Sequence, residues 1–386
     1  MTLLDRTTAS LPAAWYYDAA QYARELEAVW YRDWICVGRA EELRESGDYV
    51  VASVGEESLI LTRDRDGRMR AFYNTCRHRG SQLCATSRGR FANGRIVCPY
   101  HAWSYGLSGV LLATPRMDLP ADFRRENYPL YGAHLDTWGG FLFVNLSEKP
   151  AATLAAFLGG EAENVQRWPL ADLVSVHREV STLACNWKLF WENYSECYHC
   201  PGIHPELCRV MPIYREGLLS YADSRAGAPP GNAGDSRSRV APGFVTWTLD
   251  GQTKLPLIEG PSAADRALGV VFASFTANLF IVAHPDYVRS VRIAARGPEQ
   301  IELTIDWLLP PGVAERHADE LEKMITLGRL VVAQDGRACE LNQRGLRSRR
   351  HRAGVLMPQE AALHEFHDWL RAHLAAQEEF PCPSSS

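Results

Sequence analysis

Two short segments, each with one cysteine and one histidine, constrain the fold of this chain more than any other feature. Residues 76–80 read CRHRG and residues 98–103 read CPYHAW, with nineteen residues between His78 and Cys98. Gly80 and Pro99 suit tight loops, so each segment can offer one thiolate and one imidazole to a metal. The fold must therefore bring the two loops together around a single metal group.

Two kinds of metal group fit these ligands. With Cys76 and Cys98 on one iron and His78 and His101 on the other, the loops hold a [2Fe–2S] cluster whose neutral imidazoles raise its reduction potential. The alternative is a structural zinc ion, since two Cys and two His also suit tetrahedral Zn²⁺. Three aromatic residues near the second motif could shield the metal from water and favour the cluster: Tyr100, Trp103 and Tyr105.

A second group of ligand side chains lies in residues 186–207, NWKLFWENYSECYHCPGIHPEL. Glu192, Glu196 and His199 are spaced i, i+4 and i+7, which predicts that they share one face of a helix. His204 follows after a proline and a glycine that should end this helix. Two histidines placed in this way can chelate one metal, and with a carboxylate they would form the two-His-one-carboxylate site typical of non-haem Fe(II) oxygenases.

A helix expected from about Ala314 to Gly345 offers the missing carboxylate. Its inward stripe is defined by three-and-four spacing and comprises Leu321, Met324, Ile325, Gly328, Val331, Val332, Asp335, Cys339 and Asn342. A buried carboxylate is costly unless it is paired or binds a metal, which makes Asp335 the best candidate. The alternative is a structural Asp335 that caps a neighbouring helix or pairs with an arginine such as Arg337.

The motifs CRHRGSQL, CPYHAWSYGLSGVL and QDGRACELNQRGLRS closely resemble the α subunits of Rieske non-haem iron oxygenases, the ring-hydroxylating dioxygenase family, and the resemblance covers most of the chain. It implies a [2Fe–2S] cluster on Cys76, His78, Cys98 and His101. It also implies a mononuclear Fe(II) on His199, His204 and Asp335.

The resemblance carries further expectations about electron transfer. It implies a homotrimer in which Glu196 hydrogen-bonds both His199 and His101 of the adjacent subunit, and so conducts electrons to the iron. Most ring-hydroxylating members have Asp in this position, and the alternative for Glu196 is a solvated carboxylate on a helix face. Asn193 is expected near the iron. Electrons should come from NAD(P)H through a separate flavin or ferredoxin-type reductase, since no G-x-G-x-x-G motif for a dinucleotide is found.

The C-x-x-C formed by Cys197 and Cys200 surrounds His199 and could be read as a thiol redox pair. Because the motif lies where the oxygenase helix is expected, we predict instead that both thiols pack around the iron site.

Composition indicates an ordinary folded protein of two domains. Hydrophobic residues make up 46% and charged residues 23%, and the net charge of -5 gives no footprint for nucleic acid or an anionic membrane. The N-terminal residues lack the pattern of a signal peptide, and no stretch reads as a membrane helix, which predicts a cytoplasmic protein.

The order of patterns along the chain predicts an α+β fold. We expect an N-terminal helical segment (1–34) that packs on the catalytic domain, and a small antiparallel β Rieske domain (35–150). Residues 151–386 should form the catalytic iron domain, a helix-covered antiparallel sheet of the START/Bet v1-like kind. Residues 225–243, rich in Gly, Ala, Pro and Ser, should be a long mobile loop.

The substrate is constrained less strongly. The segments ENYSECYHCPGIHPEL and NLFIVAHPDYV are similar to the branch that oxidises choline, carnitine and glycine betaine, which predicts hydroxylation or oxidative N-demethylation of a quaternary ammonium compound. Aromatic side chains that could surround such a cation are Trp191, Tyr194, Tyr198, Trp247, Phe272, Phe275 and Phe280. The alternative is hydroxylation or O-demethylation of an aromatic acid or other small ring compound, for which the pocket would need a cationic anchor.

Overall fold

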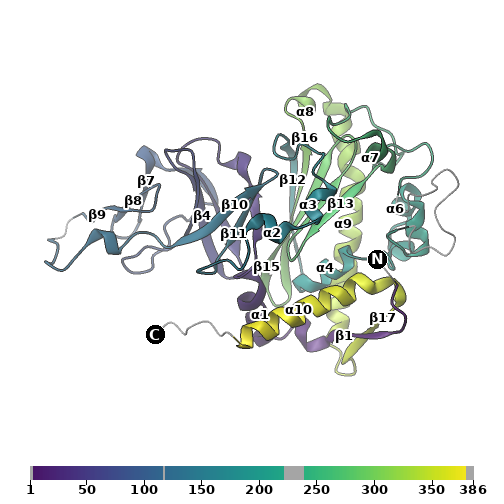
Figure 1. The fold of residues 1–386 in the computed structure, drawn as a ribbon, viewed down its shortest axis with the longest axis horizontal. Helices are drawn as coiled ribbons and strands as arrows, with labels where there is room; N and C mark the ends of the chain where they lie inside the picture. The colour runs from purple at the N-terminus through teal and green to yellow at the C-terminus, as the bar shows by residue number, and fades with distance from the viewer. Residues whose placement is uncertain (1–2, 116–117, 221–238, 380–386) are drawn as a thin grey trace. The chain divides into compact units, whose positions relative to one another are not determined.

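The computed structural model describes residues 3–115, 118–220 and 239–379 of the 386-residue chain. The chain divides into two compact units, Trp30–Leu158 and a second unit formed by Met1–Val29 together with Gly159–Ser386. In chain order the smaller unit is therefore inserted into the larger one (Figure 1). Most of the expected loop at 225–243 lies outside the described residues.

The smaller unit consists of two antiparallel sheets that share one core. The first has the strand order β2-β11-β10-β5-β4-β3-β6, with bounds Ile35–Arg39 (β2), Asp48–Val54 (β3), Glu57–Arg63 (β4), Met69–Tyr73 (β5), Arg88–Arg90 (β6), Gly132–Trp138 (β10) and Phe141–Asn145 (β11). The second is β7-β8-β9, with bounds Arg95–Val97, Ser104–Gly106 and Leu111–Ala113. Ile60 and Phe72 of the first sheet pack with Ile96, Tyr105 and Leu111 of the second. This core supports the loops that carry both cysteine–histidine motifs.

The larger unit is organised around a five-stranded antiparallel sheet with the order β12-β16-β15-β14-β13. Its strands are Val174–Leu183 (β12), Val271–Phe275 (β13), Leu279–Ala283 (β14), Val288–Gly297 (β15) and Gln300–Leu309 (β16). All five residues of β14 are buried, as expected for the apolar run LFIVA inside a sheet. A separate pair of strands joins Thr8–Pro12 (β1) to Ala353–Leu356 (β17).

The helices of the larger unit lie around this sheet (Figure 1). They are Ala19–Glu25 (α1), Glu161–Asn164 (α3), Trp187–Tyr194 (α4), Cys200–Ile203 (α5), Pro205–Val210 (α6), Ala263–Leu268 (α7), Val313–Arg316 (α8), Ala318–Leu346 (α9) and Ala361–Glu379 (α10), while Leu154–Leu158 (α2) belongs to the smaller unit. The long helix α9 lies close to the sheet where it has glycine. Gly336 faces Leu183 of β12, and Gly328 faces Arg289 of β15. The C-terminal half of α9 lies beside α4, where Cys339 Sγ donates to the Leu189 carbonyl at 3.5 Å.

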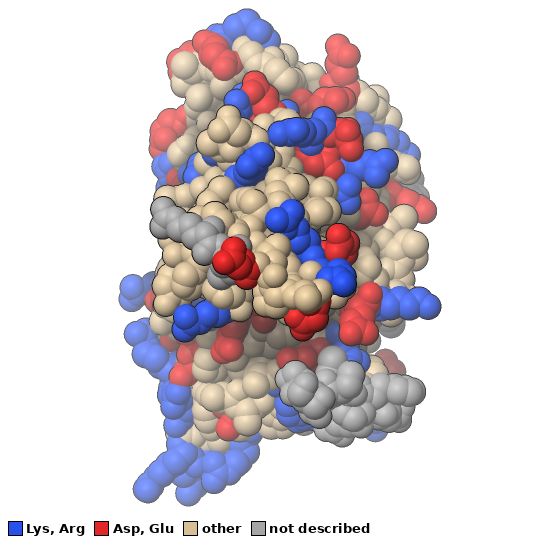
Figure 2. Space-filling model, turned by 90° about the vertical axis from the view of Figure 1, so that its left-hand side faces the viewer, with Lys and Arg blue, Asp and Glu red and all other residues tan. Residues whose placement is uncertain are grey.

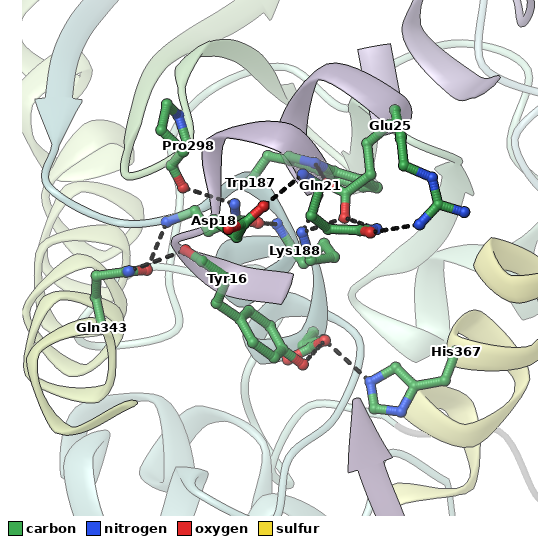
Figure 3. Close-up of polar contacts among 12 residues, drawn as sticks. Tyr16, Asp18, Gln21, Glu25, Trp187, Lys188, Pro298, Gln343 and His367 are labelled. Carbon is green, nitrogen blue, oxygen red and sulfur yellow. Dashed lines mark hydrogen bonds and ion pairs between the residues drawn. The ribbon is translucent and has the colours of Figure 1, made fainter. Parts of the chain in front are cut away.

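A buried ion pair ties the N-terminal segment to α4. The Lys188 ammonium lies 2.8 and 2.7 Å from the two carboxylate oxygens of Glu25, and both side chains are 0% exposed. Trp187 Nε1 and Gln21 Nε2 also donate hydrogen bonds to this carboxylate (Figure 3). Glu25 of α1 therefore has three side-chain donors, as a buried carboxylate requires.

A second buried carboxylate, Glu192, connects the N-terminal segment to α10. Tyr16 donates its hydroxyl proton to Glu192 Oε1 at 2.7 Å, and His367 Nε2 lies 3.0 Å from the same oxygen (Figure 3). α4, which leads directly to the candidate iron ligands, is thus held in both its first and its last turn.

The expected α+β class is confirmed, but two helix boundaries were wrong. The described part of the expected N-terminal helical segment (1–34) is not one helix, because it contains a 3₁₀ turn at Ala13–Tyr16, the short helix α1 capped by Asp18 and a π-helical turn at Leu26–Trp30. The helix expected to carry His199 ends at Tyr194. Along α9 the predicted inward stripe is buried or half-buried except Asn342, which is exposed.

No helix in the described part of the chain has the length and apolar character that a membrane crossing requires. On the face drawn in Figure 2, basic and acidic side chains are interspersed with broad uncharged areas.

Candidate metal centres and the cavity beside one of them

Both cysteine–histidine motifs form tight loops at strand ends of the smaller unit. The Cys76 loop follows β5 and is closed by a bond from Gly80 N–H to Cys76 C=O at 2.9 Å. The Cys98 loop connects β7 to β8, and Ala102 N–H donates to Cys98 C=O at 3.1 Å. Gly80 and Ala102 both have positive φ, +71° and +56°, which turns each loop back on itself. The two loops thus have the same form.

The four predicted cluster residues come together between these loops. The rings of His78 and His101 are 4.7 Å apart, and Cys76 and Cys98 are buried free thiols. Burial raises the pKa of Cys76, and the Tyr105 hydroxyl lies 3.2 Å from its Sγ. Two thiols and two imidazoles in one place match the donor set of a Rieske cluster.

The polar atoms of His78 provide a further test of fit. Its Nδ1 is buried and has no hydrogen-bond partner among the described residues, as expected for a nitrogen that serves as a metal ligand. Burial, together with the charges of His101 and Arg79, lowers the pKa of His78 and so favours the neutral form that binds metal. Of the expected shielding residues, Trp103 stacks on His78 at 4.9 Å and Tyr105 is buried, whereas Tyr100 is 58% exposed.

The second centre lies in the larger unit, where three elements place ligand atoms around one point. His199 Nδ1 donates to Glu196 Oε1 at 2.5 Å, and His204 Nδ1 donates to Gln334 Oε1 at 2.7 Å, since both oxygens can only accept. The Nε2 atoms therefore face Asp335 Oδ1, at 3.4 Å from His199 and 2.7 Å from His204. In each histidine the hydrogen bond at Nδ1 orients the ring and leaves Nε2 to bind a metal. Two such nitrogens and one carboxylate match the donor set of mononuclear Fe(II).

The electrostatics of this centre agree with its geometry. Burial disfavours the charged form of His199, but hydrogen bonds to Asp335 and Glu196 outweigh it and raise the pKa of His199 to about 9. Burial also opposes ionisation of Asp335, yet hydrogen bonds from His199 and His204 lower its pKa. The anionic carboxylate attracts a cation to this point, and a metal ion binding there would displace the His199 proton.

Asp335 is buried on α9, as the helical stripe predicted. The alternative partner Arg337 is exposed, and Asp335 contacts the two histidines instead. Gln334, which orients His204, was not predicted. Its position next to Asp335 in the sequence was the only available signal.

Glu196 lies beside His199 for a different reason than predicted. α4 ends at Tyr194, so Glu196 and His199 do not share a helical face. Instead the Glu196 carboxylate accepts hydrogen bonds from the backbone N–H groups of Tyr198 and His199 and closes the turn before α5. Asn193 lines the same cavity as the ligands, and its Oδ1 has no partner among the described residues.

The expectation about Cys197 and Cys200 was half right. Both are buried next to the ligands, as predicted, but the structure joins them in a disulfide, which the prediction had rejected. The Cys200 sulfur lies 3.8 Å from His199 Nε2. Because this sulfur is bonded to Cys197, it is not a free thiolate ligand in this form.

A cavity of about 740 Å³ opens beside the second centre, with His199, His204 and Asp335 in its wall. Aromatic side chains also line it: Trp191, Tyr194, Tyr214, Trp247, Phe272, Phe366 and Trp369. Four of the seven predicted aromatics are in this list. Phe275 and Phe280 pack in the core, and Tyr198 is exposed. Tyr214, Phe366 and Trp369 were missed because their segments carry no metal-ligand motif.

Comparison with protein families decides the family. The description "Ring hydroxylating alpha subunit (catalytic domain)" matches residues 170–376, and "Rieske [2Fe-2S] domain" matches residues 33–124. The chain belongs to the Rieske non-haem iron oxygenases. As a Rieske oxygenase it uses a [2Fe–2S] cluster and a mononuclear iron, and it depends on O₂ and on a separate reductase.

Relatives of this Rieske oxygenase include several monooxygenases. The oxygenase subunit of glycine betaine monooxygenase from Chromohalobacter salexigens is 30% identical over 402 residues, which cover 97% of this chain and 88% of that protein. Chloroplastic choline monooxygenase from Spinacia oleracea is 27% identical over 374 residues, which cover 94% of this chain and 78% of that protein. The crystal structure of the quaternary ammonium Rieske monooxygenase CntA in complex with gamma-butyrobetaine is 25% identical, with a TM-score of 0.72 over 96% of this chain and 95% of that one.

Proposed function

We propose that this Rieske oxygenase hydroxylates a quaternary ammonium compound at an N-methyl group or an adjacent carbon. The observation that carries the proposal is the cavity, which is lined by the predicted iron ligands and by a set of aromatic rings. The names of the relatives, which act on glycine betaine and choline, support the same substrate class.

The aromatic walls suit a cation that cannot donate hydrogen bonds. Trp247 is central, with its ring 6.4 Å from Tyr214 and 5.8 Å from Phe272. A quaternary ammonium group interacts favourably with such ring faces, and methyl groups fill the apolar space between them. The rings would also exclude water from the reacting C–H bond.

The chemistry balances for an N-methyl substrate. One atom of O₂ enters the C–H bond, and the other leaves as water with two electrons from the reductase and two protons. The resulting hydroxymethyl ammonium loses formaldehyde and a proton, which leaves a tertiary amine. When bound, the mononuclear iron supplies O₂ activation. The residues of this chain orient the substrate and hold the ligands through Glu196 and Gln334.

We assign the ligands as predicted: Cys76, His78, Cys98 and His101 for the cluster, and His199, His204 and Asp335 for the mononuclear iron. We further propose a homotrimer in which Glu196 links His199 to His101 of the adjacent subunit. Glu196 is suited to this role because it already accepts a hydrogen bond from His199 Nδ1 and its side chain keeps 9% exposure. The expected donors are a flavin or ferredoxin-type reductase with NAD(P)H, and the cytoplasmic location stays a prediction.

One observation favours the second candidate function, oxidation of an aromatic acid. That reading requires a cationic anchor in the pocket, and Arg289 lines the cavity. The two candidates differ in whether the substrate needs a quaternary nitrogen.

The deciding experiment uses purified protein reconstituted with iron and a generic ferredoxin reductase. Betaines, choline and aromatic acids are screened for substrate-dependent O₂ uptake and formaldehyde release. We expect turnover with at least one quaternary amine. Asp335→Ala should abolish turnover, and Asp319→Ala, an exposed position on the same helix, should not. Turnover with aromatic acids but with no quaternary amine would contradict the proposal.

Glu196 can be tested in the same system. Glu196→Gln should leave the cluster reducible by the reductase but slow its reoxidation in the presence of substrate and O₂. An unchanged reoxidation rate would refute the bridging role, and sedimentation of the holoenzyme tests the trimer.

A further inference from the structure

Arg289 is a buried cation in the wall of the substrate cavity with few partners of its own. It lies on β15 and is 1% exposed. Its Nη2 donates to the Tyr194 hydroxyl at 2.9 Å, and its Nε and Nη1 find no acceptor within the described ranges. Among the same residues no carboxylate lies within ion-pair distance of the guanidinium. A buried guanidinium without a counter-ion lowers the stability of the fold, so a functional reason for Arg289 at this position is expected.

The surrounding structure makes room for this guanidinium. Gly328 of α9 faces it, and a Cβ at this position would lie 2.5 Å from Arg289 Nη1. Glycine inside a helix weakens that helix. Two features that cost stability, an unpaired cation and a helical glycine, therefore meet at one point of the cavity wall. Loss of stability concentrated at a ligand cavity is typical of a functional site.

The cation lies next to the aromatic part of the same wall. The Arg289 Cζ is 5.9 Å from the ring centroid of Trp247, and Tyr194 also lines the cavity. Its charge reaches neighbouring groups as well, because burial and then Arg289 lower the pKa of His284. The cavity thus combines ring faces that suit a quaternary ammonium group with a positive charge that suits an anion.

We propose that Arg289 binds a carboxylate of the substrate, so that this oxygenase prefers compounds with both a quaternary ammonium and a carboxylate over quaternary alcohols. The planar guanidinium matches a carboxylate and supplies the counter-ion that the protein itself does not. The ammonium part of this inference rests on the proposed function, whereas the carboxylate part does not.

The test compares glycine betaine, which has a carboxylate, with choline, which has a hydroxyl in its place. Binding to the iron-loaded holoenzyme is measured by calorimetry, and KM and kcat are measured with the reductase. We expect Arg289→Gln to weaken glycine betaine binding by about 10- to 100-fold, the range for a hydrogen bond to a charged group, while choline binding changes by less than about 3-fold. Arg296→Gln, on the same strand but exposed, should change neither.

A second variant keeps the charge and displaces it. Gly328→Ala should push the guanidinium away from α9 and selectively weaken glycine betaine binding. If Arg289→Gln fails to fold, the carboxylate site is tested with Gly328→Ala and Arg289→Lys, again by comparing the binding of glycine betaine with that of choline.

The outcomes separate this inference from the proposed function. Equal losses for glycine betaine and choline, with unchanged thermal unfolding, overturn the carboxylate site and leave the proposed function intact. If the wild type binds neither compound but binds benzoate, and Arg289→Gln loses benzoate, the carboxylate site stands and the proposed function fails. A wild type that prefers choline overturns the inference directly.

Discussion

Replacing Lys188 by methionine should severely destabilise the larger unit. Lys188 and Glu25 are both fully buried, with Nζ at 2.8 and 2.7 Å from the two carboxylate oxygens. Burial lowers the pKa of Lys188, although the charge of Glu25 and its hydrogen bonds to Lys188 oppose this. Removing one partner leaves the other charge buried, which costs about 3–5 kcal/mol.

A matched control removes an ion pair of the same chemistry at the surface. Lys323 Nζ lies 3.0 Å from Asp250, whose side chain is 59% exposed, so Lys323→Met should cost only about 0–1 kcal/mol. Adding Glu25→Gln to Lys188→Met should restore about 1–3 kcal/mol, because the uncompensated charge is gone.

The assay is urea unfolding of the iron-loaded protein, followed by tryptophan fluorescence. Similar losses of unfolding free energy for Lys188→Met and Lys323→Met would refute the reasoning, since burial is the only intended difference between the two pairs.

Three further predictions concern the metal centres. Asp335→Ala should reduce the iron content from about three atoms per chain to about two, while the visible spectrum of the cluster is unchanged; loss of both together would argue against separate sites. Cys76→Ser should abolish the cluster spectrum and its reduction by dithionite, and the mutant should still bind about one Fe(II) per chain in a titration; an intact spectrum would remove Cys76 from the ligand set. Cys197 and Cys200 should resist iodoacetamide in denatured, unreduced protein and react after reduction, as read by peptide mass spectrometry; alkylation without reduction would show that the disulfide is absent.

Local sequence patterns were sufficient to predict that the Cys and His of each cluster loop lie close together and that Asp335 faces inward. A Cys-x-His or Cys-x-x-His motif fits within one turn, so its two ligands are close whatever the rest of the chain does. Asp335 could be predicted because helical periodicity reports which side of α9 is inward, and a carboxylate on that side needs a partner.

Patterns failed where a side chain competes with the helix. The spacing of Glu196 and His199 fits a helix, but the Glu196 carboxylate accepts backbone N–H groups and stabilises a turn in its place. Arg289 was missed because arginine in a strand is usually exposed. Only the tertiary contact with Gly328, distant in sequence, shows that it is buried at the cavity.

The chain order of the two units sets the delay between the synthesis of the N-terminal segment and that of its partner α4. Glu25 precedes its partner Lys188 by 163 residues, and the entire Rieske unit lies between them. At about 5–20 residues per second, the N-terminal segment waits about 8–30 seconds on the ribosome for that partner. The Rieske unit can be complete before the catalytic unit closes around α4. An expression fragment that starts at Gly159 would lack Glu25 and would have to fold with the Lys188 charge uncompensated.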